Sequence, residues 1–229
     1  MKWQTIGIIG GLGTETSSGF CVNINRCIRQ RMGIQPHLIT ENVPMSVIEE
    51  MRLIHGEQCQ SVRDKLIAAI ERMNRLNVDA IVIPCNSVHV FFDELRQKTK
   101  IPLLNIIEET AQHCERNNLR KVGLLATTTT VQQQLHQQEL RKRGIQAMVP
   151  TEIQQKHVDR CIEKILNNKA AANDKNELLA IVEKLKDNGA QGIILGCTDL
   201  GLMIQQKDAD ILLIDTLKVL ENALLNGMN

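Results

Sequence analysis

The sequence has few aromatic residues and lacks an excess of charge of either sign. Among its 229 residues are 3 Phe, 1 Trp and no Tyr, too few for the stacked rings on which single-strand nucleic-acid binders depend. The 27 Lys and Arg oppose 26 Asp and Glu, which leaves a formal net charge of +1. A chain without a basic excess matches neither nucleic acid nor an anionic membrane surface. We therefore expect a small-molecule partner, with no nucleic acid and no membrane.

Long apolar runs and paired cysteines are missing as well. No stretch approaches the ~20 apolar residues of a membrane-spanning helix, and the first residues do not resemble a secretory signal. The 7 cysteines are odd in number and include no Cys-x-x-Cys pair, and a chain of this length needs no disulfides. The 6 histidines show no zinc-ligand spacing. The sequence predicts a soluble cytoplasmic protein with free thiols and no metal site.

Short apolar runs alternate with helix-length segments along the whole chain. Amphipathic patterns predict helices at 14–32, 56–77 and 130–143. Apolar, β-branched runs predict strands at 5–9, 38–40, 80–84, 101–106, 121–126, 192–195 and 211–215. Such alternation is typical of parallel sheets with helices on both faces. The predicted fold class is α/β.

The second half of the chain repeats the first. Gly7 precedes Gly123 by 116 residues, and Cys85 precedes Cys197 by 112 residues. These similar offsets predict two α/β lobes of about 110 residues related by a pseudo-two-fold axis, with the active site in the cleft between them. We place the first lobe at 1–100, with a return of the C-terminal helix at about 216–229, and the second lobe at 101–215.

Cys85 and Cys197 each follow a predicted strand, one in each lobe. Ligands of open parallel sheets bind at the carboxyl ends of the strands, so facing lobes would point both thiols into one cleft. One thiolate could then remove a proton from carbon while the opposite thiol supplies a proton to the other face, which inverts a stereocentre without a cofactor. The N-terminus of the helix after each strand would favour the thiolate. The other five cysteines fall in helical patterns and are predicted to be packing residues.

Four motifs resemble those of the aspartate/glutamate racemase family over about residues 5 to 220: Gly10-Gly11-Leu12-Gly13, Pro84-Cys85-Asn86-Ser87, Ala126-Thr127-Thr128 and Gly196-Cys197-Thr198-Asp199. The resemblance is closest to the aspartate racemases. It implies two α/β lobes, pyridoxal-independent two-base racemisation with no cofactor, and a homodimer. By this resemblance Cys85 and Cys197 are the catalytic acid/base residues. The substrate-binding residues that the resemblance implies are Gly11, Leu12, Gly13, Asn86, Ser87, Thr127, Thr128 and Thr198.

An aspartate substrate also needs a cation for its side-chain carboxylate. The family's aspartate enzymes use an Arg after the second strand and a Lys in the second lobe, and the positions that resemble these are Arg52 and Lys169. Lys164 is an alternative to Lys169, and a solvated surface position is the alternative for each of them. The chain has Asp199 where glutamate racemases carry a His, which favours the aspartate branch.

Other functions compete with aspartate racemisation. The first is a racemase or isomerase in the same superfamily that acts on glutamate, another amino acid or a diacid. The glycine loop at 11–16 with Glu41 weakly resembles a dinucleotide-binding fingerprint, and an amino-acid sensor could keep the cleft without using the thiols. His89 follows Cys85 by four residues, which could indicate a nucleophilic hydrolase, although packing is the simpler role.

Overall fold

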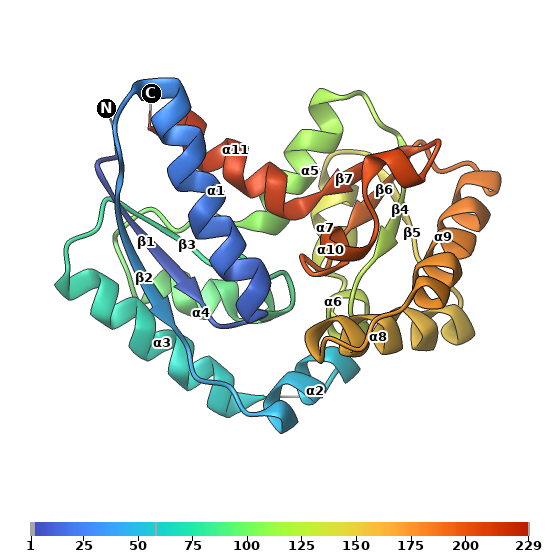
Figure 1. Ribbon diagram of the computed structural model, residues 1–229, viewed down its shortest axis with the longest axis horizontal. Coiled ribbons are helices and arrows are strands. Elements are labelled where there is room, and N and C mark those ends of the chain that lie inside the picture. Colours follow the sequence, from blue (N-terminus) through green and yellow to red (C-terminus); the bar gives the residue numbers. More distant parts are fainter. Residues whose placement is uncertain (1–2, 58, 229) are drawn as a thin grey trace.

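The chain folds into two parallel sheets, each covered by helices on both faces (Figure 1). The computed structural model describes residues 3–57 and 59–228. The strands are β1 Thr5–Gly10, β2 His37–Asn42, β3 Ala80–Val82, β4 Lys121–Leu125, β5 Gln146–Met148, β6 Gly192–Leu195 and β7 Leu212–Asp215. The helices are α1 Thr14–Met32, α2 Val47–His55, α3 Gln60–Arg75, η1 Ser87–Phe91, α4 Phe92–Gln97, α5 Ile106–Arg116, α6 Thr128–Gln132, α7 Leu135–Lys142, α8 Glu152–Leu166, α9 Ala172–Asp187, α10 Leu200–Met203, η2 Gln206–Asp208 and α11 Thr216–Gly227. No helix in the described ranges is both long and apolar enough to cross a membrane.

The two sheets have matching topology. Their strand orders are β2-β1-β3 and β5-β4-β6-β7, and every strand pair is parallel. Leu103 forms a single parallel bridge to Ile81 and so occupies, in the first sheet, the place that β7 takes in the second. The register matches too, because Gly7 pairs with Ile81 and Gly123 pairs with Ile193. The predicted α/β fold of two similar lobes is confirmed.

Helices α5 and α11 lie where the lobes meet (Figure 1). The first turn of α5 packs Ile106 and Ile107 against the core that contains β1. Further along the same helix, Ala111 and Cys114 pack against the core that contains β4. Helix α11 contacts both α1 and α5. Because these helices share their apolar faces between the two cores, the division at residues 100 and 215 stays a prediction.

Several predicted elements differ from the structure, and the strand predicted at 80–84 covers only Ala80–Val82. The segment 101–106 is wrong as a strand, since only Leu103 forms a bridge and α5 begins at Ile106. The single helix predicted at 130–143 is also wrong. Gln134 adopts φ 53°, a left-handed conformation that separates α6 from α7. The helix predicted at 56–77 is shorter and covers Gln60–Arg75, and a separate helix, α2, precedes it.

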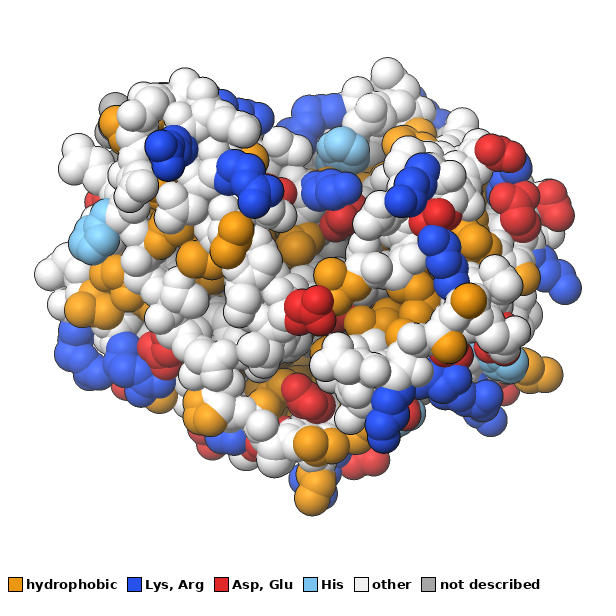
Figure 2. Space-filling view, in the orientation of Figure 1, with side chains coloured by type: hydrophobic (Ala, Val, Ile, Leu, Met, Phe, Trp, Pro, Cys, Tyr) orange, Lys and Arg blue, Asp and Glu red, His pale blue; other side chains and the backbone are white. Residues whose placement is uncertain are grey.

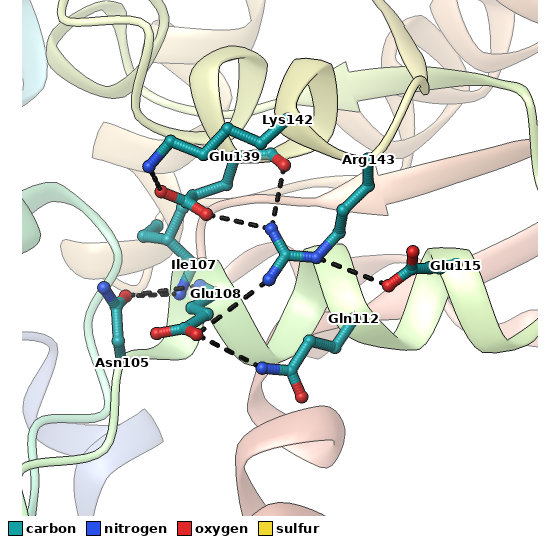
Figure 3. Close-up of polar contacts among 8 residues, drawn as sticks. All are labelled: Asn105, Ile107, Glu108, Gln112, Glu115, Glu139, Lys142 and Arg143. Carbon is teal, nitrogen blue, oxygen red and sulfur yellow. Dashed lines mark hydrogen bonds and ion pairs between the residues drawn. The ribbon is translucent and has the colours of Figure 1, made fainter.

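A polar network around Arg143 joins α5 to α7 (Figure 3). The Arg143 guanidinium donates to the carbonyl oxygen of Glu139 at 3.0 Å and to its carboxylate at 2.9 Å. It also forms ion pairs with Glu115 at 3.6 Å and Glu108 at 3.9 Å. The Arg143 side chain is only 15% exposed, so these interactions are less screened by solvent than a surface ion pair.

Replacement of this arginine by an apolar residue should therefore destabilise the second lobe. We expect Arg143→Met to lower the free energy of unfolding by about 1–3 kcal/mol, because it removes charge-assisted hydrogen bonds from a mostly buried position. Urea denaturation measures the change. Lys142→Met is the matched control, since Lys142 pairs with the same Glu139 but is 67% exposed, and it should change stability by under about 0.5 kcal/mol. Equal losses in the two variants would contradict this account.

Candidate active site

A cavity lies between the lobes at the carboxyl ends of four central strands. Most of its lining comes from the segments that directly follow β1, β3, β4 and β6. The remaining lining comes from α2 and the segment before it, and from α8. The cavity volume is about 40 Å³. This is smaller than the usual small-molecule site of about 300–1,000 Å³, so the two lobes lie in a closed arrangement.

Most of the predicted site residues line this cavity. The first lobe contributes Leu12, Gly13, Cys85, Asn86 and Ser87, and the second contributes Thr127, Cys197 and Thr198.

Four other predicted residues do not line it. Gly11 packs against the backbone of Val43, where a Cβ would come within 2.5 Å of the carbonyl oxygen. Thr128 turns to Asp159 instead and donates its hydroxyl at 2.6 Å. Arg52 is half exposed and pairs with Glu57 at 3.4 Å, and Lys169 is exposed. The alternative cation, Lys164, forms an ion pair with Asp174.

The two thiols have raised pKa values. Burial raises the pKa of Cys85 to about 12, and the charges of Asp199 and Glu50 add to this effect. Burial and the charge of Asp199 raise the pKa of Cys197 well above its usual value, and the charge of Cys85 contributes as well. The backbone N–H groups of Val88 and Ser87 act in the opposite direction on Cys85, because they donate to the thiolate. Both cysteines are therefore thiols at neutral pH, mainly because they are buried.

Two carboxyl groups in the cavity were missed as site residues in the sequence. Asp199 lies two residues after Cys197, whose thiol donates to its carboxylate at 3.6 Å. The Thr16 hydroxyl, from α1 of the other lobe, donates to the same carboxyl group. Gly13 makes room for this contact, since a Cβ there would come within 2.8 Å of an Asp199 carboxylate oxygen. Glu50, from α2, also lines the cavity, and burial raises the pKa of both acids.

The hydroxyl groups of the cavity form a hydrogen-bonded cluster across the two lobes. The Ser87 hydroxyl lies 2.8 Å from that of Thr127, and Thr130 lies within 3.4 Å of both. Thr127 also caps the N-terminus of α6 by accepting from the Thr130 N–H. These hydroxyls can donate hydrogen bonds to a carboxylate.

Two buried histidines hold the segment that follows β3. His89 Nδ1 donates to the carbonyl oxygen of Cys85 at 2.7 Å, and His89 Nε2 accepts from the Ile106 N–H. His136 Nε2 donates to the side-chain oxygen of Asn86 at 3.0 Å. The Asn86 amide in turn donates to the Thr216 hydroxyl at 3.0 Å. Burial lowers the pKa of His89 to about 4 and that of His136 to about 3, so both rings are neutral at pH 7.

Comparison with known proteins agrees with this arrangement. The family model described as Asp/Glu/Hydantoin racemase matches residues 9–224. The chain belongs to this family. A relative from Bacillus subtilis, named the broad specificity amino-acid racemase RacX, is 24% identical over 219 residues, which cover 92% of each chain.

Solved structures of other family members share the two-lobed fold. An aspartate racemase homologue from Pyrococcus horikoshii is 26% identical with a TM-score of 0.80, and the match covers 99% of this chain and 100% of that one. The aspartate racemase of Picrophilus torridus is 22% identical with a TM-score of 0.82, over 97% and 93% of the two chains. Glutamate racemases match as well. Membership of the racemase family is thus shown, and the fold does not distinguish aspartate from glutamate as the substrate.

Membership of this family removes the support for a dinucleotide enzyme. Glu41, considered as a ribose acceptor, forms an ion pair with Arg72, whose Nε lies 2.9 and 3.0 Å from its two carboxylate oxygens. Its carboxylate thus already has a cationic partner in the protein.

Proposed function

We propose that this member of the family is a cofactor-independent amino-acid racemase in which Cys85 and Cys197 are the two bases. The observation that carries the proposal is that both thiols line one cavity and follow equivalent strands, β3 and β6, of two matching lobes. A planar carbanion has two faces, and a base on each face is what inversion requires. Binding alone needs neither thiol, which argues against an amino-acid sensor.

The proposed reaction is a proton exchange across the α-carbon. One cysteine, as thiolate, takes the α-proton and becomes a thiol, and the C–H electron pair stays on the substrate. The opposite thiol then gives its proton to the other face of the α-carbon and becomes a thiolate. The substrate carboxylate would accept hydrogen bonds from the Ser87 and Thr127 hydroxyls, which stabilise the charge that spreads onto its oxygens. The α-ammonium of the substrate would lower the raised thiol pKa values by placing a positive charge in the cavity.

The proposal extends to the substrate and to the oligomeric state of the protein. Aspartate is the substrate that the resemblance implies, and the Pyrococcus structure is described as an aspartate racemase homologue. The Bacillus subtilis relative is named for broad specificity, which favours testing a panel of amino acids. A homodimer is also implied by the resemblance, and light scattering from the purified protein tests it.

The test is isotope exchange in heavy water. Purified, reduced protein is incubated with each enantiomer of aspartate, glutamate, lysine and norleucine, without pyridoxal phosphate. We expect loss of optical rotation together with deuterium at the α-carbon of both enantiomers, since the thiols exchange with solvent. Folded protein that introduces no α-deuterium into any of these amino acids would contradict the proposal.

A further inference from the structure

The lining of the proposed site carries two carboxyl groups and no cation. Among the residues that the structure describes, Glu50 and Asp199 are the charged side chains of the cavity, and no Lys, Arg or His lines it. Figure 2 shows acidic and hydrophobic side chains close together near the middle of this face, where the two lobes meet. A substrate with an acidic side chain requires a cation in the site, whereas the charged groups of this lining are carboxyl groups.

Glu50 is the carboxylate available to a ligand. Asp199 already accepts hydrogen bonds from Thr16 and from the Cys197 thiol. Glu50 has no hydrogen bond or ion pair from any side chain in the described part of the chain. The influences on its pKa are burial and the charge of Asp199, which both raise it. A half-buried carboxylate without a partner, facing a cavity, is suited to receive a positive group.

The wall around Glu50 is aliphatic. Leu53 and Ile54 follow it by three and four residues on α2, so all three side chains share one helix face. Ile162 and Leu166, one turn apart on α8, line the same cavity. Helix α2 contacts α8 directly, which brings these two apolar faces together. The resulting subsite has apolar sides and one carboxylate.

On the basis of the proposed racemase function, we infer that the substrate side chain is an aliphatic stem that ends in a cation, as in lysine or ornithine, and that Glu50 selects it. The stem would pack on the wall of α2 and α8 while its ammonium pairs with Glu50. An acidic side chain would instead bring a further negative charge toward the half-buried Glu50 and the buried Asp199, with no cation to compensate for it. A neutral stem would cover Glu50 without pairing it, which leaves the carboxylate desolvated.

The experiment compares side chains of matched length. Rates of α-deuterium incorporation are measured for lysine, for norleucine, which lacks only the terminal amine, and for aspartate. We expect kcat/KM for lysine to exceed that for norleucine by about 10-fold or more, and that for aspartate by a larger factor. Glu50→Gln should bring the lysine-to-norleucine ratio close to about one, because it removes the charge and keeps the size. Glu57→Gln is the matched control, since Glu57 is exposed and lies outside the cavity, and it should leave the ratio unchanged.

A binding measurement separates this inference from the proposed function. If no amino acid gains α-deuterium, the racemase proposal fails, and the midpoint of thermal unfolding with each amino acid still reports on the subsite. Lysine should then stabilise the wild-type protein more than norleucine or aspartate does, and Glu50→Gln should remove that difference. Turnover or stabilisation by aspartate or norleucine equal to or greater than that by lysine would overturn the assignment of a cationic side chain. A lysine preference that survives Glu50→Gln would overturn the role of Glu50.

Discussion

Cys85→Ser and Cys197→Ser should each lower racemisation by about 10²–10⁴-fold, the usual contribution of a general acid or base. A serine hydroxyl keeps nearly the size of the thiol, but its far higher pKa leaves almost no oxyanion to accept the α-proton. Each variant should retain slow α-proton exchange with only one enantiomer, because the remaining thiol reaches one face of the α-carbon. The enantiomer that still exchanges should be opposite in the two variants. The measurement is deuterium incorporation into each enantiomer without inversion, with chiral chromatography to separate the enantiomers.

The control for the thiol variants is Cys27→Ser. Cys27 is half-buried on α1, a free thiol that does not line the cavity, and its replacement should leave the rate close to that of the wild type. A Cys85→Ser or Cys197→Ser protein that racemises at the wild-type rate would remove that cysteine from the mechanism. Loss of activity in all three variants would instead indicate general damage to the fold.

Acid should destabilise the protein through its two buried histidines. Both rings are neutral in the folded state, with pKa values lowered by burial to about 4 for His89 and about 3 for His136. The unfolded chain takes up these protons near pH 6.5. The contribution of each histidine is therefore complete above about pH 6.5 and is lost as the pH falls toward the folded-state values. At about 1.4 kcal/mol per pH unit for each ring, the two together should remove about 5 kcal/mol between pH 6.5 and 4.5.

A variant isolates this effect from that of the acidic groups. Buried carboxyls with raised pKa, such as Asp199, take up protons in the folded state and offset part of the loss. His136→Gln keeps a donor for Asn86 and does not titrate. We expect its free energy of unfolding to fall by about 3 kcal/mol less than that of the wild type between pH 6.5 and 4.5. Denaturant titrations across this pH range measure the difference, and parallel curves for the two proteins would contradict the assignment.

The sequence predicted those parts of the fold and site that local patterns determine. The apolar runs of β1, β4 and β6 and the periodicity of α1 are set by burial along the chain itself, and they were predicted nearly to the residue. Cys85 and Cys197 were predicted to share a cleft because each follows such a strand, and they line one cavity. Their catalytic roles stay a prediction.

The features of the fold and site that were not predicted depend on contacts between distant segments or on short sequence motifs. Helix α2, which carries Glu50, was missed, although Ser46 and Glu49 have the spacing of a capping box and form one in the structure. The partners of Asn86, at His136 and Thr216, lie 50 and 130 residues away, so no local pattern reports them. Arg52 and Lys169 were placed by resemblance at loosely matching positions. Neither lines the cavity, because Arg52 pairs with Glu57 and Lys169 lies in an exposed loop.

The hydrogen bond from Thr16 to Asp199 joins residues 183 positions apart, one in each lobe. The acid that raises the pKa of Cys197 is therefore held in place by the opposite half of the molecule. A movement that separates the lobes would break this bond and expose Asp199 to water, which weakens its effect on the thiol. The pKa of Cys197, which burial raises most, thus depends also on a contact between the two lobes.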